Sequence, residues 1–132
     1  MLGDLVYEGK GRTICVRMLD NKGTKEITTQ EEGSVLGIPC TLMVTFVSTH
    51  RPDGTEYSEG QGVLYTKDGD SASLNVSCVL IPKGIPPSGN LRGATFFGTQ
   101  SPKLARLNTV ATVFEAEMKE DMSYTVKDWE WK

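Results

Sequence analysis

Apolar and polar residues alternate along most of this chain, and clusters of Gly, Pro, Asn and Asp interrupt the alternation about every dozen residues. Alternation with period two is typical of β-strands, because successive side chains point to opposite faces of a sheet. The pattern predicts strands at residues 4–19, 25–36, 39–50, 56–67, 71–81, 90–99, 109–119 and 123–131. Eight strands leave little of the chain for helices, so an all-β fold is expected.

The clusters between the strands have the composition of tight hairpin turns, because Gly, Asn and Asp tolerate the positive φ angles that such turns require. The clearest are Asp20-Asn21-Lys22-Gly23, Arg51-Pro52-Asp53-Gly54, Lys67-Asp68-Gly69-Asp70 and Glu120-Asp121-Met122-Ser123. Neighbouring strands are therefore expected to pair antiparallel. Pro102, directly after Ser101, indicates one short helical turn near residues 102–107.

The two faces of the predicted strands differ from one strand to the next. Residues 71–78 put Ser and Asn on one face and apolar residues on the other, whereas residues 41–47 and 109–114 are largely apolar on both faces. Strands of the second kind need a partner chain outside or a cavity inside. Because closure removes unpaired edges, we favour a closed eight-stranded antiparallel β-barrel over a sandwich. We also expect a homo-oligomer, either a dimer or a trimer.

Glycines recur in pairs inside two of these strands. Glu8-Gly9-Lys10-Gly11 is echoed by Glu59-Gly60-Gln61-Gly62. A glycine inside a strand usually marks a bulge or a bend, and we expect these glycines to form the corners of the barrel. The pairs lack the spacing and the following helix of a phosphate-binding loop.

Length and composition restrict the remaining possibilities. The 132 residues fit a single domain, 1–132, with a net charge of −3 that disfavours nucleic acid as a partner. The cysteines Cys15, Cys40 and Cys78 are too scattered for a zinc site and are expected to be reduced core residues. An acidic N-terminal segment and the absence of a long apolar run predict a cytoplasmic protein without a membrane span. No metal and no other cofactor is indicated.

Charge is distributed unevenly. All 17 acidic residues lie outside residues 71–114, which carry Lys83, Arg92, Lys103 and Arg106. A cationic band between acidic flanks favours contact with an anion. Asn108, which follows Arg106 closely, is a further candidate for the same site.

Arg92 and Glu115 lie among uncharged residues of two predicted strands, so one or both could point inward. A buried charge is usually paired, and an internal ion pair of Arg92 with Glu115, or with Glu59, would fix the register of the barrel. Alternatively, Arg92 meets a ligand carboxylate. Trp129 and Trp131 share one face of the last strand and are expected to anchor the core or an interface. No catalytic motif stands out around His50 or elsewhere.

Three segments and the C-terminal end resemble a family of small uncharacterised prokaryotic proteins. They are Glu59–Gly69, Leu91–Phe97, Ser101–Asn108 and Trp129-Glu130-Trp131-Lys132. That family is similar in fold to the eight-stranded barrel of allene oxide cyclase, which binds an unsaturated fatty-acid epoxide in its barrel and is trimeric. The resemblance implies a closed barrel, but a fold does not transfer chemistry and no catalytic residue is carried over.

These observations lead to a hypothesis of function. The barrel is expected to bind a small apolar molecule with an anionic group, contacted by Lys103 and Arg106 at the mouth and by Arg92 deeper inside. One alternative is an isomerase or cyclase in which Glu59 or Glu115 polarises a small apolar substrate. Another is a structural oligomer whose barrel is filled by side chains.

Overall fold

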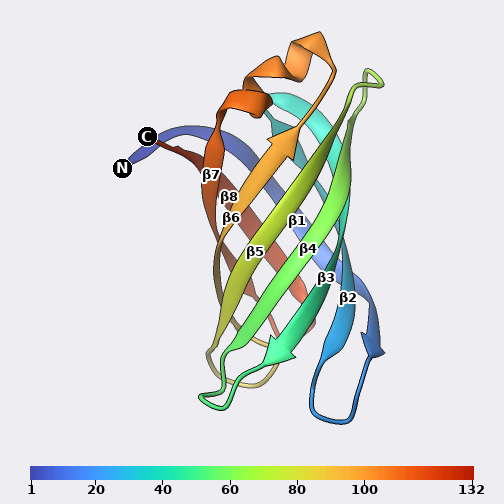
Figure 1. The fold of residues 1–132 in the computed structure, drawn as a ribbon, viewed down its shortest axis with the longest axis vertical. Helices are drawn as coiled ribbons and strands as arrows, with labels where there is room; N and C mark the ends of the chain where they lie inside the picture. The colour runs from blue at the N-terminus through green and yellow to red at the C-terminus, as the bar shows by residue number, and fades with distance from the viewer.

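Eight strands form a closed barrel in the computed structural model, which describes residues 1–132 (Figure 1). The strands are β1 (Leu2–Met18), β2 (Lys25–Val35), β3 (Ile38–His50), β4 (Glu56–Thr66), β5 (Ser71–Pro82), β6 (Gly89–Gly98), β7 (Ala111–Met118) and β8 (Ser123–Trp131). A 3₁₀ helix, η1 (Pro102–Thr109), connects β6 to β7. No helix of the structure is long and apolar enough to cross a membrane.

Each strand pairs antiparallel with its neighbours along the chain, and β1 also pairs with β8 to close the barrel. The predicted all-β fold, the eight strands and the barrel are therefore confirmed. Hairpins form where glycine takes a positive φ, as at Gly23, Gly54 and Gly69. The turn from β2 to β3, at Leu36 and Gly37, is the tightest, and the sequence predicted it one residue later, at 37–38, because Leu36, which carries a positive φ, is not a typical turn residue.

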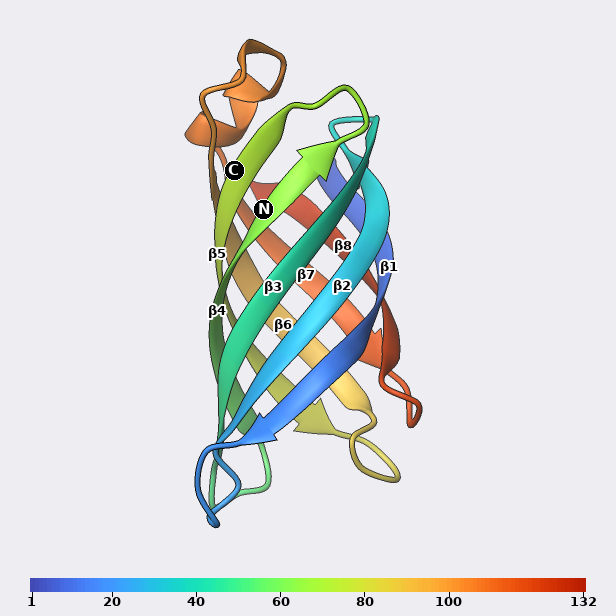
Figure 2. The same ribbon diagram turned by 90° about the vertical axis from the view of Figure 1, so that its right-hand side faces the viewer.

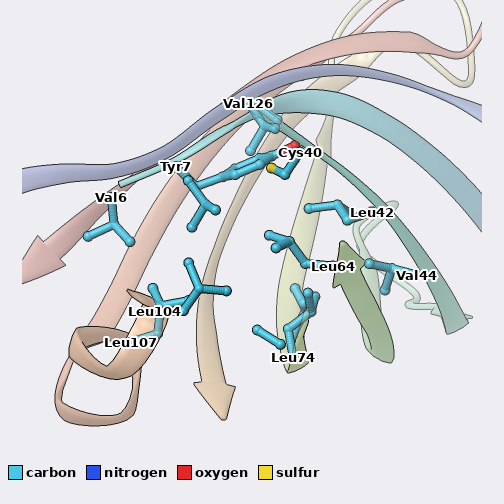
Figure 3. Close-up of a cluster of buried hydrophobic side chains, with 14 of the residues drawn as sticks. Val6, Tyr7, Cys40, Leu42, Val44, Leu64, Leu74, Leu104, Leu107 and Val126 are labelled. Carbon is cyan, nitrogen blue, oxygen red and sulfur yellow. The ribbon is translucent and has the colours of Figure 1, made fainter. Parts of the chain in front are cut away.

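The helix η1 covers one end of the barrel (Figures 1 and 2). Its side chains Leu104 and Leu107 are fully buried and belong to the hydrophobic core, which includes Leu64, Leu74 and Val6. Figure 3 shows both leucines directed from the helix toward the core inside the barrel. The predicted helical turn is thus confirmed, and it acts as a plug.

Large side chains inside the barrel lie over glycines. A Cβ atom added to Gly9 would lie 2.3 Å from the Tyr7 hydroxyl, and one added to Gly60 would lie 2.6 Å from the Phe46 ring. The ladder around both glycine pairs continues without a bulge, and the irregularities of β1 lie instead between Thr13 and Cys15 in its pairing with β2 and between Leu2 and Tyr7 in its pairing with β8. The glycines therefore make room for rings, which corrects the expectation of bulges at these positions.

Both faces of β3 are apolar, as the sequence indicated. Leu42 and Val44 are buried in the barrel, whereas Met43 and Val47 are exposed on its outer surface. In β5 the small polar residues face outward, whereas the side chains of Ala72, Leu74 and Val76 face the core. The interior of the barrel is thus filled at the end near η1, and the other end contains the candidate site.

Candidate functional site

A cavity of about 520 Å³ occupies the end of the barrel opposite η1. This end, the mouth, is formed by the connections at residues 19–24, 51–55, 83–88 and 119–122, which lie together at the lower end in Figure 2. Eleven of the 19 residues that line the cavity are hydrophobic. Pro86 and Pro87, in the connection from β5 to β6, contribute to its wall.

The rim of the cavity carries one ion pair. Lys25 Nζ lies 2.9 Å from Glu56 Oε1, and Ser48 Oγ donates a hydrogen bond of 3.1 Å to the same oxygen. The pairing of β2 with β3 sets Lys25 opposite Ser48 near the strand ends. Lys25 is the only basic residue in the cavity wall.

A carboxyl group with two tyrosine partners lies deeper in the barrel. Glu31 accepts hydrogen bonds from the hydroxyls of Tyr7, at 2.9 Å, and Tyr124, at 2.5 Å. Burial raises the pKa of Glu31 above its ordinary value, although the two tyrosine donors act in the opposite direction. Burial and the adjacent Glu31 carboxyl also raise the pKa of both tyrosines, so the phenols stay protonated.

Asp128 is a second buried carboxyl group on β8. Its side chain is 4% exposed and accepts a hydrogen bond of 3.1 Å from Thr112 Oγ1. Burial, and to a smaller extent the charge of Glu31, raise the pKa of Asp128 to about 7. Both carboxyl groups line an inner cavity of about 50 Å³, and Phe46 and Phe114 line this inner cavity as well as the mouth cavity.

The remaining polar groups of the mouth cavity include a thiol and a hydroxyl. Burial raises the pKa of Cys78 to about 11, so its thiol is not an activated nucleophile near neutral pH. Thr29 Oγ1 is buried beside the Tyr124 hydroxyl and makes no hydrogen bond of acceptable geometry. Cys40 is also buried and free, but Cys15 is exposed, which corrects the expectation that all three cysteines are core residues.

Arg92 and Glu115 face outward, so the prediction that they point into the barrel is wrong. They are opposite each other on β6 and β7, and Arg92 Nη2 lies 3.8 Å from Glu115 Oε2 with both side chains more than half exposed. The predicted pairing is therefore present, but on the outer surface. Glu59 is exposed as well and accepts a hydrogen bond of 2.5 Å from the Tyr57 hydroxyl.

The basic residues of η1 lie at the plugged end, not at the mouth. Lys103 Nζ is 3.7 Å from Asp68, and Arg106 Nη2 is 2.9 Å from Asp4 and 2.5 Å from Glu130. Three of the four cations of the band, Arg92, Lys103 and Arg106, are thus paired with acidic side chains from flanking segments, which the linear charge pattern could not show.

The side chain of Asn108 stabilises the connection between β6 and η1 at the plugged end. This side chain accepts a hydrogen bond from the Thr99 amide and donates one to the Thr99 carbonyl. The structure therefore brings Lys103, Arg106 and Asn108 together near one another, but it does not bring them together with Arg92, Glu59 or Glu115.

The inner carboxyl groups were missed because their strands mix polar and apolar residues on the inner face. On β8 the inward residues are Tyr124, Val126 and Asp128, and Trp131 is exposed. Trp131 therefore does not anchor the core, and its predicted role at an interface stays a prediction. A signal for Glu31 was present in the alternation: counting back in steps of two from Val35 reaches Glu31 on the same face. No group of three His, Cys, Asp or Glu side chains could hold a metal ion.

Comparison with known proteins supports the fold. No protein-family model matches the chain, and no curated protein matches it in sequence. A conserved protein of unknown function from Rhodopseudomonas palustris has a TM-score of 0.78 at 15% identity, over 98% of this chain and 97% of that chain. A beta-barrel like protein from Acinetobacter baumannii has a TM-score of 0.80 at 15% identity, over 98% and 94%. An enzyme from Penicillium herquei has a TM-score of 0.64 at 17% identity, over 98% and 96%. These similarities extend over whole chains, and at such identities they show a shared barrel fold.

Proposed function

We propose that this barrel protein binds a small, largely apolar molecule in its mouth cavity. The observation that carries the proposal is the cavity itself, which measures about 520 Å³ and is lined mainly by hydrophobic side chains. Ligand sites in proteins are typically cavities of roughly 300–1,000 Å³ with apolar walls and a few polar groups. A barrel whose interior were completely filled by side chains would lack this space, so the cavity favours binding over a purely structural role.

In the finer form of this proposal the ligand carries an anionic group that stays at the rim. Lys25 is the only cation of the cavity wall, and it is half-buried beside Glu56. Lys103 and Arg106 lie at the opposite end, so they are replaced by Lys25 in this role. The resemblance of the sequence to proteins with an allene oxide cyclase-like barrel supports a ligand inside the barrel at the level of fold only.

A test of the proposal blocks the cavity with a large side chain. Leu80 lines the cavity, whereas its neighbour Val79 is not part of the wall, so Leu80→Trp and Val79→Trp form a matched pair. Octanoate should raise the melting temperature of the wild type and of Val79→Trp, because a ligand that binds only the native state stabilises it by RT ln(1 + [L]/Kd). The affinity of Leu80→Trp for octanoate, measured by calorimetry, should be at least about tenfold lower than that of the wild type. Equal binding by both variants, or no binding by the wild type, would contradict the proposal.

The anionic group has its own control. Octanoate should bind more tightly than methyl octanoate to the wild type, and Lys25→Met should remove the difference. Equal affinity of the wild type for acid and ester would mean that the ligand needs no anionic group, while leaving the apolar site intact.

An isomerase or cyclase is the second candidate, and the buried carboxyl groups favour it. Burial raises the pKa of Asp128 to about 7, so this group can hold a proton near neutral pH and deliver it in an apolar site, and burial raises the pKa of Glu31 in the same direction. They take the place of Glu59 and Glu115, which face the solvent. Conversion of a small apolar ketone or epoxide that is lost in a Glu31→Gln variant would support catalysis.

A further inference from the structure

We propose that the inner end of the mouth cavity is a subsite for an uncharged oxygen of the ligand, such as a ketone, aldehyde or alcohol group, which Tyr124 and Thr29 bind while Glu31 supports Tyr124 from behind. The proposal rests on the proposed function, because it assumes that the mouth cavity holds a ligand. The proposal adds the chemical class of the ligand group that lies at the inner end of the mouth cavity.

Thr29 gives the first argument. Its side chain is 4% exposed and lines the mouth cavity, and its Oγ1 makes no hydrogen bond of acceptable geometry. A buried polar group without a partner is costly, and such groups in native proteins usually have a reason. Rotation about χ1 would turn this hydroxyl toward a ligand oxygen at the inner end of the cavity, which would then supply the missing partner.

Tyr124 gives the second argument, because it connects Glu31 to the cavity. Its side chain lines the mouth cavity while its hydroxyl lies 2.5 Å from Glu31 Oε2. When Glu31 is protonated, its single proton can be donated to the Tyr124 oxygen. The hydroxyl hydrogen of Tyr124 is then free to point into the cavity and to be donated to a carbonyl oxygen. No atom is transferred: the hydrogen bond between Tyr124 and Glu31 only reverses its direction.

The group is held in place by close packing. A Cβ atom added to Gly11 would lie 2.5 Å from Glu31 Cγ and 2.7 Å from the Tyr124 hydroxyl. Both side chains therefore pack directly against the backbone of Gly11, which has no side chain to keep them away. The other carboxyl oxygen of Glu31 accepts a hydrogen bond of 2.9 Å from the Tyr7 hydroxyl. Such a subsite is preorganised, so a ligand loses little affinity to reordering of the protein.

Charge explains why the oxygen is uncharged. The inner end lies toward two buried carboxyl groups, Glu31 and Asp128, and the only cation of the cavity wall, Lys25, lies at its rim. A carboxylate at the inner end would be desolvated without a cation to pair with, which is unfavourable. An uncharged carbonyl accepts hydrogen bonds without this cost.

The test compares two probes of nearly the same shape, 2-octanone and 2-methyl-1-octene, in which a methylene group replaces the carbonyl oxygen. After correction for the partition of the two probes between water and hydrocarbon, the wild type should favour the ketone over the alkene by about tenfold, which corresponds to one or two hydrogen bonds. In Thr29→Val and Tyr124→Phe the preference should shrink, and in the double variant it should vanish while the alkene still binds. Tyr57→Phe, which removes the same hydroxyl on the outer surface, should keep the full preference.

Infrared spectroscopy of carbonyl-labelled 2-octanone gives a second readout that does not depend on a variant folding. The carbonyl stretch of the ketone bound to the wild type should lie below its frequency in hydrocarbon solvent, because hydrogen bonding weakens the C=O bond. No preference for the ketone beyond the partition of the two probes between water and hydrocarbon, together with a hydrocarbon-like frequency, would overturn the subsite and leave the proposed function standing. Failure of both probes to bind would instead refute the proposed function.

Discussion

Asp128 makes the stability of this protein depend on pH in an unusual direction. Its carboxyl group is buried on the inner face of β8, and burial raises its pKa in the folded protein to about 7 from an ordinary value of 3.8. The folded state therefore binds a proton that the unfolded state releases between these two pH values. Stability from this group is complete below pH 3.8 and is lost as the pH rises toward 7.

The size of the effect follows from the two pKa values. Each unit of difference corresponds to about 1.4 kcal/mol, so ionisation of Asp128 lowers the free energy of unfolding by about 4 kcal/mol above pH 7. Asp128→Asn removes the titration while keeping the shape of the side chain and an oxygen that can accept the hydrogen bond from Thr112. The variant should exceed the wild type in stability by up to about 4 kcal/mol at pH 8 and by only about 1 kcal/mol at pH 4.5.

Urea denaturation followed by far-ultraviolet circular dichroism from pH 4.5 to 8.5 measures this difference directly. Asp121→Asn is a control of opposite sign, because side-chain and backbone hydrogen bonds from Ser123 hold the pKa of Asp121 below its ordinary value. That variant should be less stable than the wild type by an amount that stays constant from pH 4.5 to 8.5, because the pKa of Asp121 lies below its ordinary value of 3.8 and the group titrates outside this range. A difference between Asp128→Asn and the wild type that stays constant over the whole pH range would refute the reasoning.

Three further outcomes are expected. Leu104→Ala removes a fully buried side chain of η1 and should lower the free energy of unfolding, measured by urea denaturation, by about 2–5 kcal/mol. A loss below about 1 kcal/mol would mean that η1 is not packed into the core. Arg92→Met should cost less than about 1 kcal/mol, because the ion pair with Glu115 is exposed, and a loss of several kcal/mol would place Arg92 in the core after all. The protein should sediment as a dimer or trimer, because apolar side chains such as Met43 and Val63 are exposed on the outer surface, and Val63→Lys should shift it toward the monomer. A wild-type monomer of 14.4 kDa at micromolar concentration would contradict that expectation.

The strands and turns could be predicted from the sequence because their causes are local. Alternation within residues 71–78 and the Gly-containing turns act over a few neighbouring residues, and both were confirmed. The turn between β2 and β3 was predicted one residue too late, because Leu36 takes a positive φ there although it is not a typical turn residue. Local patterns thus define the elements of this barrel well.

Which side of a strand faces inward was harder to predict, because the interior of this barrel is partly polar. Residues such as Glu31 and Asp128 lie inside, whereas Trp131 is exposed. Hydrophobicity therefore did not identify the inner face of β8 or of β6, where Arg92 was wrongly assigned to the interior. The site also depends on distant pairings: Glu31 meets Tyr124 across 93 residues of sequence, and only the closure of the barrel brings them together.

The pairing of β1 with β8 also determines when, during synthesis, the barrel and its mouth cavity can form. Proteins are synthesised from the N-terminus, so on the ribosome β1 has β2 as its only neighbour until residues 123–131 have emerged. Until then one edge of β1 is unpaired, and Glu31 lacks Tyr124. The mouth cavity therefore cannot exist on a partly synthesised chain. Once β8 is in place, the amide of Lys132 is bonded to the carbonyl of Met1 and the two termini lie side by side (Figure 1). A circular permutant that joins these ends and opens the chain at a mouth turn should assemble the same barrel in a different order of synthesis.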